Sequence, residues 1–191
     1  MIVCKFGGTS VADAAAISNV VDVIVGKQAS GPVVVVSALG GATNVLLDLA
    51  HKAAGGELLA ALQLVEQLRD RHLREVHALL DGSTEADELA LEISASFDEL
   101  AHLAEAFRTL GYLTPRSLDT VAALGELLSS QIVAAAFRHR GYPAVWVDAR
   151  DVMKTNDFFT RAEPDVEDPK WLFPEDREAL LQLRLLEIGR A

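Results

Sequence analysis

The sequence predicts an α/β fold of three layers, in which helices cover a mainly parallel β-sheet. Two short apolar runs, at residues 1–6 and 33–36, each end in a glycine-rich turn. A segment with helical periodicity lies between the two runs, and another follows the second run. Strand, helix and strand in that order form a βαβ unit, whose two strands are parallel.

The first strand is expected over residues 1–6 as a short buried strand, and the helix after it over about 10–28. Ser10 precedes Asp13 by three positions, an arrangement that resembles a capping box. Apolar residues then recur at helical spacing, and Gly31–Pro32 ends the connection.

The run at 33–36 is apolar and β-branched at every position, which predicts a central strand covered on both faces. The turn SALGGATN, Ser37–Asn44, follows it and leads into a helix with apolar positions at Leu46, Leu49, Ala50 and Ala53. Both glycine turns therefore lie at the carboxyl ends of parallel strands. In open α/β sheets, ligands bind at that edge.

A largely helical insertion is predicted over about 57–140. Its three helices are expected at Glu57–Leu80, Thr84–Leu110 and Pro115–Arg140, with turn or cap residues at Asp81, Gly82 and Gly111. A strand at 144–147, a loop and a helix over about 174–188 complete the chain. With only about three strands counted, the central strand is short of flanking partners.

Composition limits the classes of protein that the chain can belong to. Its 191 residues are 50% hydrophobic, which suits one domain with its own core, and its formal net charge of −11 argues against a nucleic-acid surface. The apolar stretches are shorter than the roughly 20 residues that a bilayer requires, and no signal-peptide pattern opens the chain. We expect a cytoplasmic protein that does not bind membranes. The single cysteine, Cys4, excludes an intrachain disulfide and is expected to be a small buried side chain.

The two glycine turns indicate phosphate chemistry. Free backbone N–H groups in a tight turn bind anions, and Lys5 supplies a positive charge beside the first turn. Neither turn is a Walker loop or a GxGxxG fingerprint. Alternatively, the glycines only form tight turns and Lys5 extends into solvent. No metal site is expected, because the histidines lack metal-ligand spacing and suit helix surfaces or the interior: His51, His72, His77, His102 and His139.

Four stretches of the chain resemble successive signatures of one enzyme family. They are KFGGTSVAD, VVVVSALGGATNVL, LGELLSSQIVAAAFRHRGYPAVWVDAR and MKTNDFFTRAEPD. In this order and spacing they resemble the aspartate kinases of the amino acid kinase superfamily. The resemblance implies ATP-dependent phosphorylation of the side-chain carboxylate of L-aspartate, with magnesium accompanying ATP, in the biosynthesis of lysine, threonine and methionine. Since that carboxylate is already ionised at neutral pH, no general base is needed.

The resemblance also implies roles for individual residues. Lys5 would stabilise the transferring phosphoryl group, on a phosphate and nucleotide side that also includes Gly7, Gly8, Thr9 and Ser10. The acceptor pocket would be lined by Ser37, Gly41, Thr43 and Asn44. Glu126 would pair with the ammonium of aspartate, and Arg161 with a carboxylate.

Each of the two charged residues has a simpler interpretation. Glu126 could be a solvated helix residue, although the apolar sequence around it favours burial, and Arg161 could be a surface arginine. Asp157, Glu163 and Asp165 are either loop carboxylates or partners that hold Arg161.

The resemblance covers residues 1–165, the amino-acid-binding part of the kinase domain, so the expected amino acid kinase-like fold is incomplete at the C-terminus. The remaining segment, 166–191, is expected to be a divergent, helical tail without the GGSD-type motif and regulatory domains of these enzymes. A fragment, an early stop and a small aspartate-binding protein are all open. Other readings are a kinase of another acceptor, such as glutamate or acetylglutamate, and a non-catalytic module that completes its sheet with a partner or a second copy.

Overall fold

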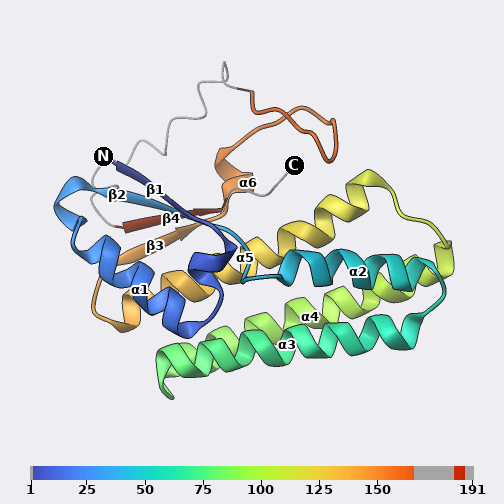
Figure 1. The fold of residues 1–191 in the computed structure, drawn as a ribbon, viewed down its shortest axis with the longest axis horizontal. Helices are drawn as coiled ribbons and strands as arrows, with labels where there is room; N and C mark the ends of the chain where they lie inside the picture. The colour runs from blue at the N-terminus through green and yellow to red at the C-terminus, as the bar shows by residue number, and fades with distance from the viewer. Residues whose placement is uncertain (1, 166–182, 188–191) are drawn as a thin grey trace.

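The computed structural model describes residues 2–165 and 183–187. Four parallel strands form one sheet in the order β1-β2-β4-β3, and helices pack against it (Figure 1). The strands are β1 (Ile2–Phe6), β2 (Pro32–Val36), β3 (Ala144–Val147) and β4 (Leu183–Glu187). The predicted α/β class and the parallel sheet are confirmed.

Strand β2 lies in the middle of the sheet. All five of its residues are buried, and Val34 pairs with Cys4 of β1 on one side and Leu185 of β4 on the other. The central position predicted from the run of valines is confirmed. Strand β1 is not the buried strand expected, because it occupies an edge of this sheet and its Val3 is 63% exposed.

Strand β4 supplies the partner that the central strand lacked in the sequence prediction. The helix expected over 174–188 is wrong for 183–187, where the structure has a strand that pairs with both β2 and β3. Hydrogen bonds to a parallel strand on each side stabilise the extended conformation of this segment more than its local sequence stabilises a helix. The rest of the expected helix lies outside the described residues.

The connection from β1 to β2 is broken into three helical pieces, not the one helix expected over 10–28. They are the 3₁₀ turns η1 (Gly8–Val11) and η2 (Gln28–Ser30), with α1 (Ala14–Val25) between them. Asp13 is the N-cap of α1, because its carboxylate accepts a hydrogen bond from the Ala16 N–H at 2.9 Å. The capping-box role expected for Ser10 is wrong, since Ser10 lies inside η1.

Three helices lie close to their predicted bounds: α3 (Leu58–Leu80), α4 (Thr84–Leu110) and α5 (Pro115–His139). The helix expected after the second glycine turn is α2 (Ala42–Ala54). The antiparallel helices α3 and α4 form a long hairpin with α2 beside it, while α1 and α5 lie together on one face of the sheet (Figure 1). Gly111, at a φ of 72°, ends α4, and Pro115 begins α5, as predicted.

Helix α5 is the central helix of the core. By length and composition it could cross a membrane, but 72% of its most apolar window is buried inside the protein. It packs on β2, β3 and β4 and also against α1, α2, α3 and α4. A side chain on the inward faces of α5 therefore contacts the rest of the domain, not solvent.

Candidate functional site

The two glycine turns contact each other at the carboxyl ends of β1 and β2. A Cβ added at Gly8 would lie 3.4 Å from the carbonyl oxygen of Ala38, and one added at Gly40 would lie 3.2 Å from that of Gly8 and 3.0 Å from the Cβ of Ala12. A larger residue at Gly40 would push the turns apart. The predicted convergence of the two turns at one edge of the sheet is confirmed.

The second turn ends in the N-terminus of α2. Gly41 is its N-cap, with a φ of 78°, a left-handed conformation that favours glycine, and no side chain caps the helix there. Thr43, half-buried, and Asn44, exposed, lie in the first turn of α2. The partial positive charge of a helix N-terminus therefore lies beside these residues, as an anion site requires.

Helix α5 packs directly behind this second turn. The Ser129 hydroxyl donates to the Ser37 carbonyl oxygen at 2.7 Å. Gly125 lies so close that an added Cβ would be 3.0 Å from the Ala38 Cβ. Glu126, the next residue, is only 3% exposed, so its interpretation as a solvated helix residue is wrong and its expected burial is confirmed.

Lys5 lies on β1, on the approach to the first turn. Cys4 and Phe6 on either side of it are partly buried against the core, as alternation along a strand requires, while Lys5 is exposed. Within the described part of the chain, no hydrogen bond or ion pair engages its ammonium group. Lys5 is therefore available to an anion that reaches this end of the sheet.

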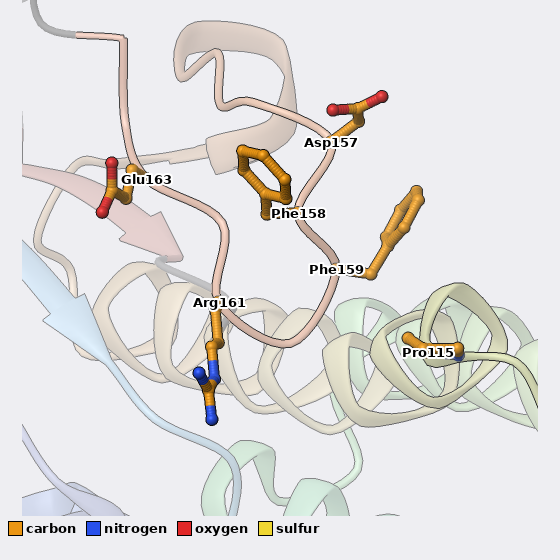
Figure 2. Close-up of a pocket in the computed structure, with 6 residues that line it drawn as sticks. All are labelled: Pro115, Asp157, Phe158, Phe159, Arg161 and Glu163. Carbon is orange, nitrogen blue, oxygen red and sulfur yellow. The ribbon is translucent and has the colours of Figure 1, made fainter.

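Arg161 lies on a loop that follows β3 and the short helix α6 (Ala149–Val152). Figure 2 shows its side chain pointing away from Asp157 and from Phe158, which are on the same loop. Arg161 is exposed, and neither Asp157 nor Glu163 forms an ion pair with it. These two carboxylates are therefore loop residues, and they do not hold the guanidinium.

A surface pocket of about 530 Å³ lies at this loop. Its lining residues come from the loop and from the start of α5: Pro115, Asp157, Phe158, Phe159, Arg161 and Glu163 (Figure 2).

Just before the loop, Asp148 caps α6. Burial raises the pKa of Asp148, but the hydrogen bonds and the charge of Arg150 outweigh that effect, so its pKa lies below the ordinary value.

Sequence reasoning missed three residues that shape this site. Gly125 and Ser129 bring α5 onto the second glycine turn, and Asp119 accepts a hydrogen bond from the loop that carries Arg161. Only Gly125 leaves a signal in the sequence, because a glycine inside an apolar helical pattern costs about 1 kcal/mol and so indicates close packing. The contacts of the other two join residues far apart in the chain.

The described residues bring together no group of three or more His, Cys, Asp or Glu side chains that could hold a metal ion. The five histidines behave as expected: four are exposed on helices, and His72 is buried in the core. Cys4 is half-buried against the core, so it is less enclosed than expected. The site therefore offers backbone N–H groups and the buried carboxylate of Glu126. It also offers the positive charges of Lys5 and Arg161, which have no partner among the described residues.

Comparisons with known proteins agree with this geometry. The model of the amino acid kinase family matches residues 1–180. The lysine-sensitive aspartokinase 3 of Escherichia coli is 34% identical over 166 residues, which cover 87% of this chain and 35% of that protein. A chloroplastic bifunctional aspartokinase/homoserine dehydrogenase 2 of Arabidopsis thaliana is 33% identical over 80% of this chain and 16% of its own length. The chain thus spans about a third of the first relative and less of the second.

Solved structures show the same likeness. E. coli aspartokinase III in complex with aspartate and ADP superposes with a TM-score of 0.80 and 30% identity, over 98% of this chain and 40% of that one. The same enzyme in complex with lysine and aspartate gives a TM-score of 0.83 with the same identity and coverage. Because the family model matches most of its length, the chain belongs to the amino acid kinase family.

Proposed function

We propose that this chain is the amino-acid-binding part of an aspartate kinase, which transfers the γ-phosphoryl group of ATP to the side-chain carboxylate of L-aspartate. The observation that carries the proposal is the contact between the two glycine turns, with α5 placing the buried Glu126 directly behind the second turn. The aspartokinases among the relatives, and the aspartate and ADP in a solved neighbour, support the choice of substrates.

In the proposed reaction a carboxylate oxygen of aspartate attacks the γ-phosphorus, and the bond from that phosphorus to the oxygen of ADP breaks. The acceptor, with a pKa of about 3.9, is ionised at neutral pH, so no protein base takes a proton. The protein aligns the two anions and neutralises their charge. Lys5 and the N–H groups of Gly7 and Gly8 would stabilise the transferring phosphoryl group, with Thr9 and Ser10 on the nucleotide side.

The acceptor would lie between α2 and α5. Its ammonium group would pair with Glu126, beside the pocket residues Ser37, Gly41, Thr43 and Asn44. Arg161 would hold a carboxylate in a bidentate pair. Because Glu126 is buried, its carboxylate would attract the substrate ammonium more strongly than an exposed carboxylate could. Glu126 and Arg161 together therefore favour a free amino acid over an acceptor without an amino group.

Magnesium would reach the site as part of the nucleotide substrate. Since the described residues hold no cluster of three metal-ligating side chains, no step is assigned to a metal held by this part of the chain. Lysine and threonine biosynthesis, a cytoplasmic location, and assembly with a second copy or with a C-terminal half also belong to the proposal. Some relatives carry chloroplastic names.

The test is calorimetric titration of the 191-residue chain with aspartate and with glutamate, beside a hydroxamate assay with ATP and magnesium. Glu126→Gln should weaken aspartate binding about tenfold or more, because a charge-assisted hydrogen bond is lost. Glu105→Gln is the matched control, since Glu105 is exposed on α4. Unchanged affinity in Glu126→Gln would show that the ammonium is bound elsewhere.

A second candidate function is aspartate binding without phosphorylation. It needs only the acceptor pocket, which the buried Glu126 and the turn before α2 would form. Aspartate binding without hydroxamate formation would support this candidate for the isolated chain. Hydroxamate formation with glutamate but not with aspartate would instead identify a kinase of another acceptor.

A further inference from the structure

We infer that Asp119 is a positioning residue that holds the loop carrying Arg161 in place for the substrate; this inference rests on the proposed function. Asp119 is half-buried on the second turn of α5, and its Oδ2 accepts a hydrogen bond from the Thr160 N–H at 2.7 Å. Thr160 immediately precedes Arg161. The hydrogen bond therefore fixes the backbone from which the guanidinium extends.

Thr160 is the point in the loop that most needs an external partner. Its φ of 67° is in the left-handed region, where a β-branched residue is uncommon and costs on the order of 1 kcal/mol or more. Such a conformation persists only where the surroundings fix it. The charged acceptor on α5 supplies that constraint, because a hydrogen bond to a carboxylate is stronger than one between neutral groups.

The rest of the loop is held by its own hydrogen bonds. The Asn156 Oδ1 accepts from the N–H of Phe158 at 3.3 Å and from that of Glu163 at 3.0 Å, and Thr155 pairs with Pro164 as an antiparallel bridge. These contacts close the base of the loop. They do not tie its tip to the domain, which is the part that Asp119 reaches.

A second contact joins the same two elements. The guanidinium carbon of Arg116, one turn before Asp119 on α5, lies 5.8 Å from the centre of the Phe159 ring. At an exposed site, such a cation–π contact contributes weakly to holding the loop against α5. Two neighbouring loop residues, Phe159 and Thr160, are thus attached to the first two turns of α5.

The same helix carries the proposed partner of the other end of the substrate. Asp119 and Glu126 are seven residues apart, so they share a face of α5 and are separated by about 10 Å along its axis. Ser129 on that helix holds the turn after β2 through Ser37. Helix α5 therefore fixes the distance between Glu126 and the tip of the Arg161 loop.

The experiment is a double-mutant cycle on aspartate affinity in the 191-residue chain. Asp119→Ala should weaken aspartate binding about tenfold, by freeing the loop. Asp119→Asn, which keeps an oxygen acceptor, should restore most of it. Thr120→Ala is the matched control, because the Thr120 hydroxyl donates only to the Arg116 carbonyl oxygen within α5.

The decisive comparison is with Arg161→Ala. If Asp119 acts through Arg161, the double variant should bind aspartate no more weakly than Arg161→Ala alone, whereas a general loss of structure would make the two effects multiply. Unaltered affinity in Asp119→Ala, or multiplying effects, would overturn the inference.

A second measurement separates this inference from the proposed function. Amide exchange at Thr160, followed by NMR, should be about fivefold faster or more in Asp119→Ala than in Thr120→Ala. A wild-type chain that binds no aspartate would overturn the proposed function, and the exchange rate would still decide whether Asp119 anchors the loop. Equal exchange in the two variants would overturn the anchoring itself.

Discussion

The buried histidine in the helical hairpin should make the protein sensitive to mild acid. His72 on α3 is 1% exposed, and its ring packs edge-on against Phe97 of α4, with centroids 5.2 Å apart. Its Nδ1 lies 2.7 Å from the Leu68 carbonyl oxygen, and its Nε2 has no hydrogen-bond partner among the described residues. Desolvation by burial, helped by the charge of Arg71, outweighs the hydrogen bond to Leu68, which favours the protonated ring, so the pKa of His72 is lowered from 6.5 to about 4.

The sign and size of the effect follow from linkage. Between pH 6.5 and about 4 the unfolded chain binds a proton at His72 that the folded chain does not, so stability falls as the pH falls through this window. With these two pKa values the free energy of unfolding drops by about 2 kcal/mol between pH 7 and pH 5. The loss approaches about 3 kcal/mol near pH 4 and then levels off.

The assay is urea unfolding of the wild type and of His72→Leu at several pH values from 4 to 8. Leucine fills a similar volume and removes the unpaired nitrogen. Any difference between the two proteins in how the free energy of unfolding depends on pH should therefore come from His72. Wild type should lose about 2 kcal/mol more than the variant between pH 7 and pH 5. Parallel pH profiles would refute the reasoning. If the variant does not fold, NMR titration of the His72 ring in the wild type decides: protonation near pH 6.5 would also refute it.

Two further changes test the packing around the site. Gly125→Ala should lower the free energy of unfolding by about 1 kcal/mol and weaken aspartate binding, since the added Cβ would lie 2.9 Å from Leu46 Cδ1 and 3.0 Å from Ala38 Cβ. Urea unfolding and calorimetry measure both, and a stabilised variant would show that α5 and the turn can separate without cost. Asp13→Ala should cost about 1 kcal/mol of stability through loss of the α1 cap, whereas Asp13→Asn should keep most of it; equal losses in thermal unfolding would contradict the capping role.

The parts of the fold that the sequence predicted well are those determined by local patterns. Helix α4 begins and ends at the predicted residues, Thr84 and Leu110, because its apolar periodicity is long and Gly111 stops it. The central position of β2 follows in the same way from its uninterrupted valines. These features depend on neighbours in the chain.

The parts that it predicted wrongly depend on distant partners. The stretch 183–187 has a pattern compatible with a helix, yet it is a strand because β2 and β3 offer it pairing on both sides. The exposure of β1 has a related cause, since its apolar sequence does not show that it lies at an edge of this sheet. Tertiary pairing outweighs local propensity in both cases.

In the site too, the features set by local sequence were predicted, and those set by distant contacts were not. Strand-end glycines in two consecutive units suffice to predict that the turns converge, and contacts at Gly8 and Gly40 confirm it. Ser129, by contrast, acts on a residue 92 positions away, and Asp119 on one 41 positions away. A serine or an aspartate on a helix carries no local mark of such a partner.

Helix α5 gives these long-range contacts a common origin. It packs on three strands of the sheet, and one side of it meets the turn after β2 while its first two turns meet the Arg161 loop. A displacement of α5 by the width of a methyl group would therefore move Glu126 and the attached loop together, relative to the turn after β2. Gly125→Ala changes no charge and alters no residue proposed to bind the substrate. It should nevertheless weaken aspartate binding at both ends of the substrate, the ammonium group at Glu126 and the carboxylate at Arg161. Asp119→Ala should weaken binding only at the carboxylate end.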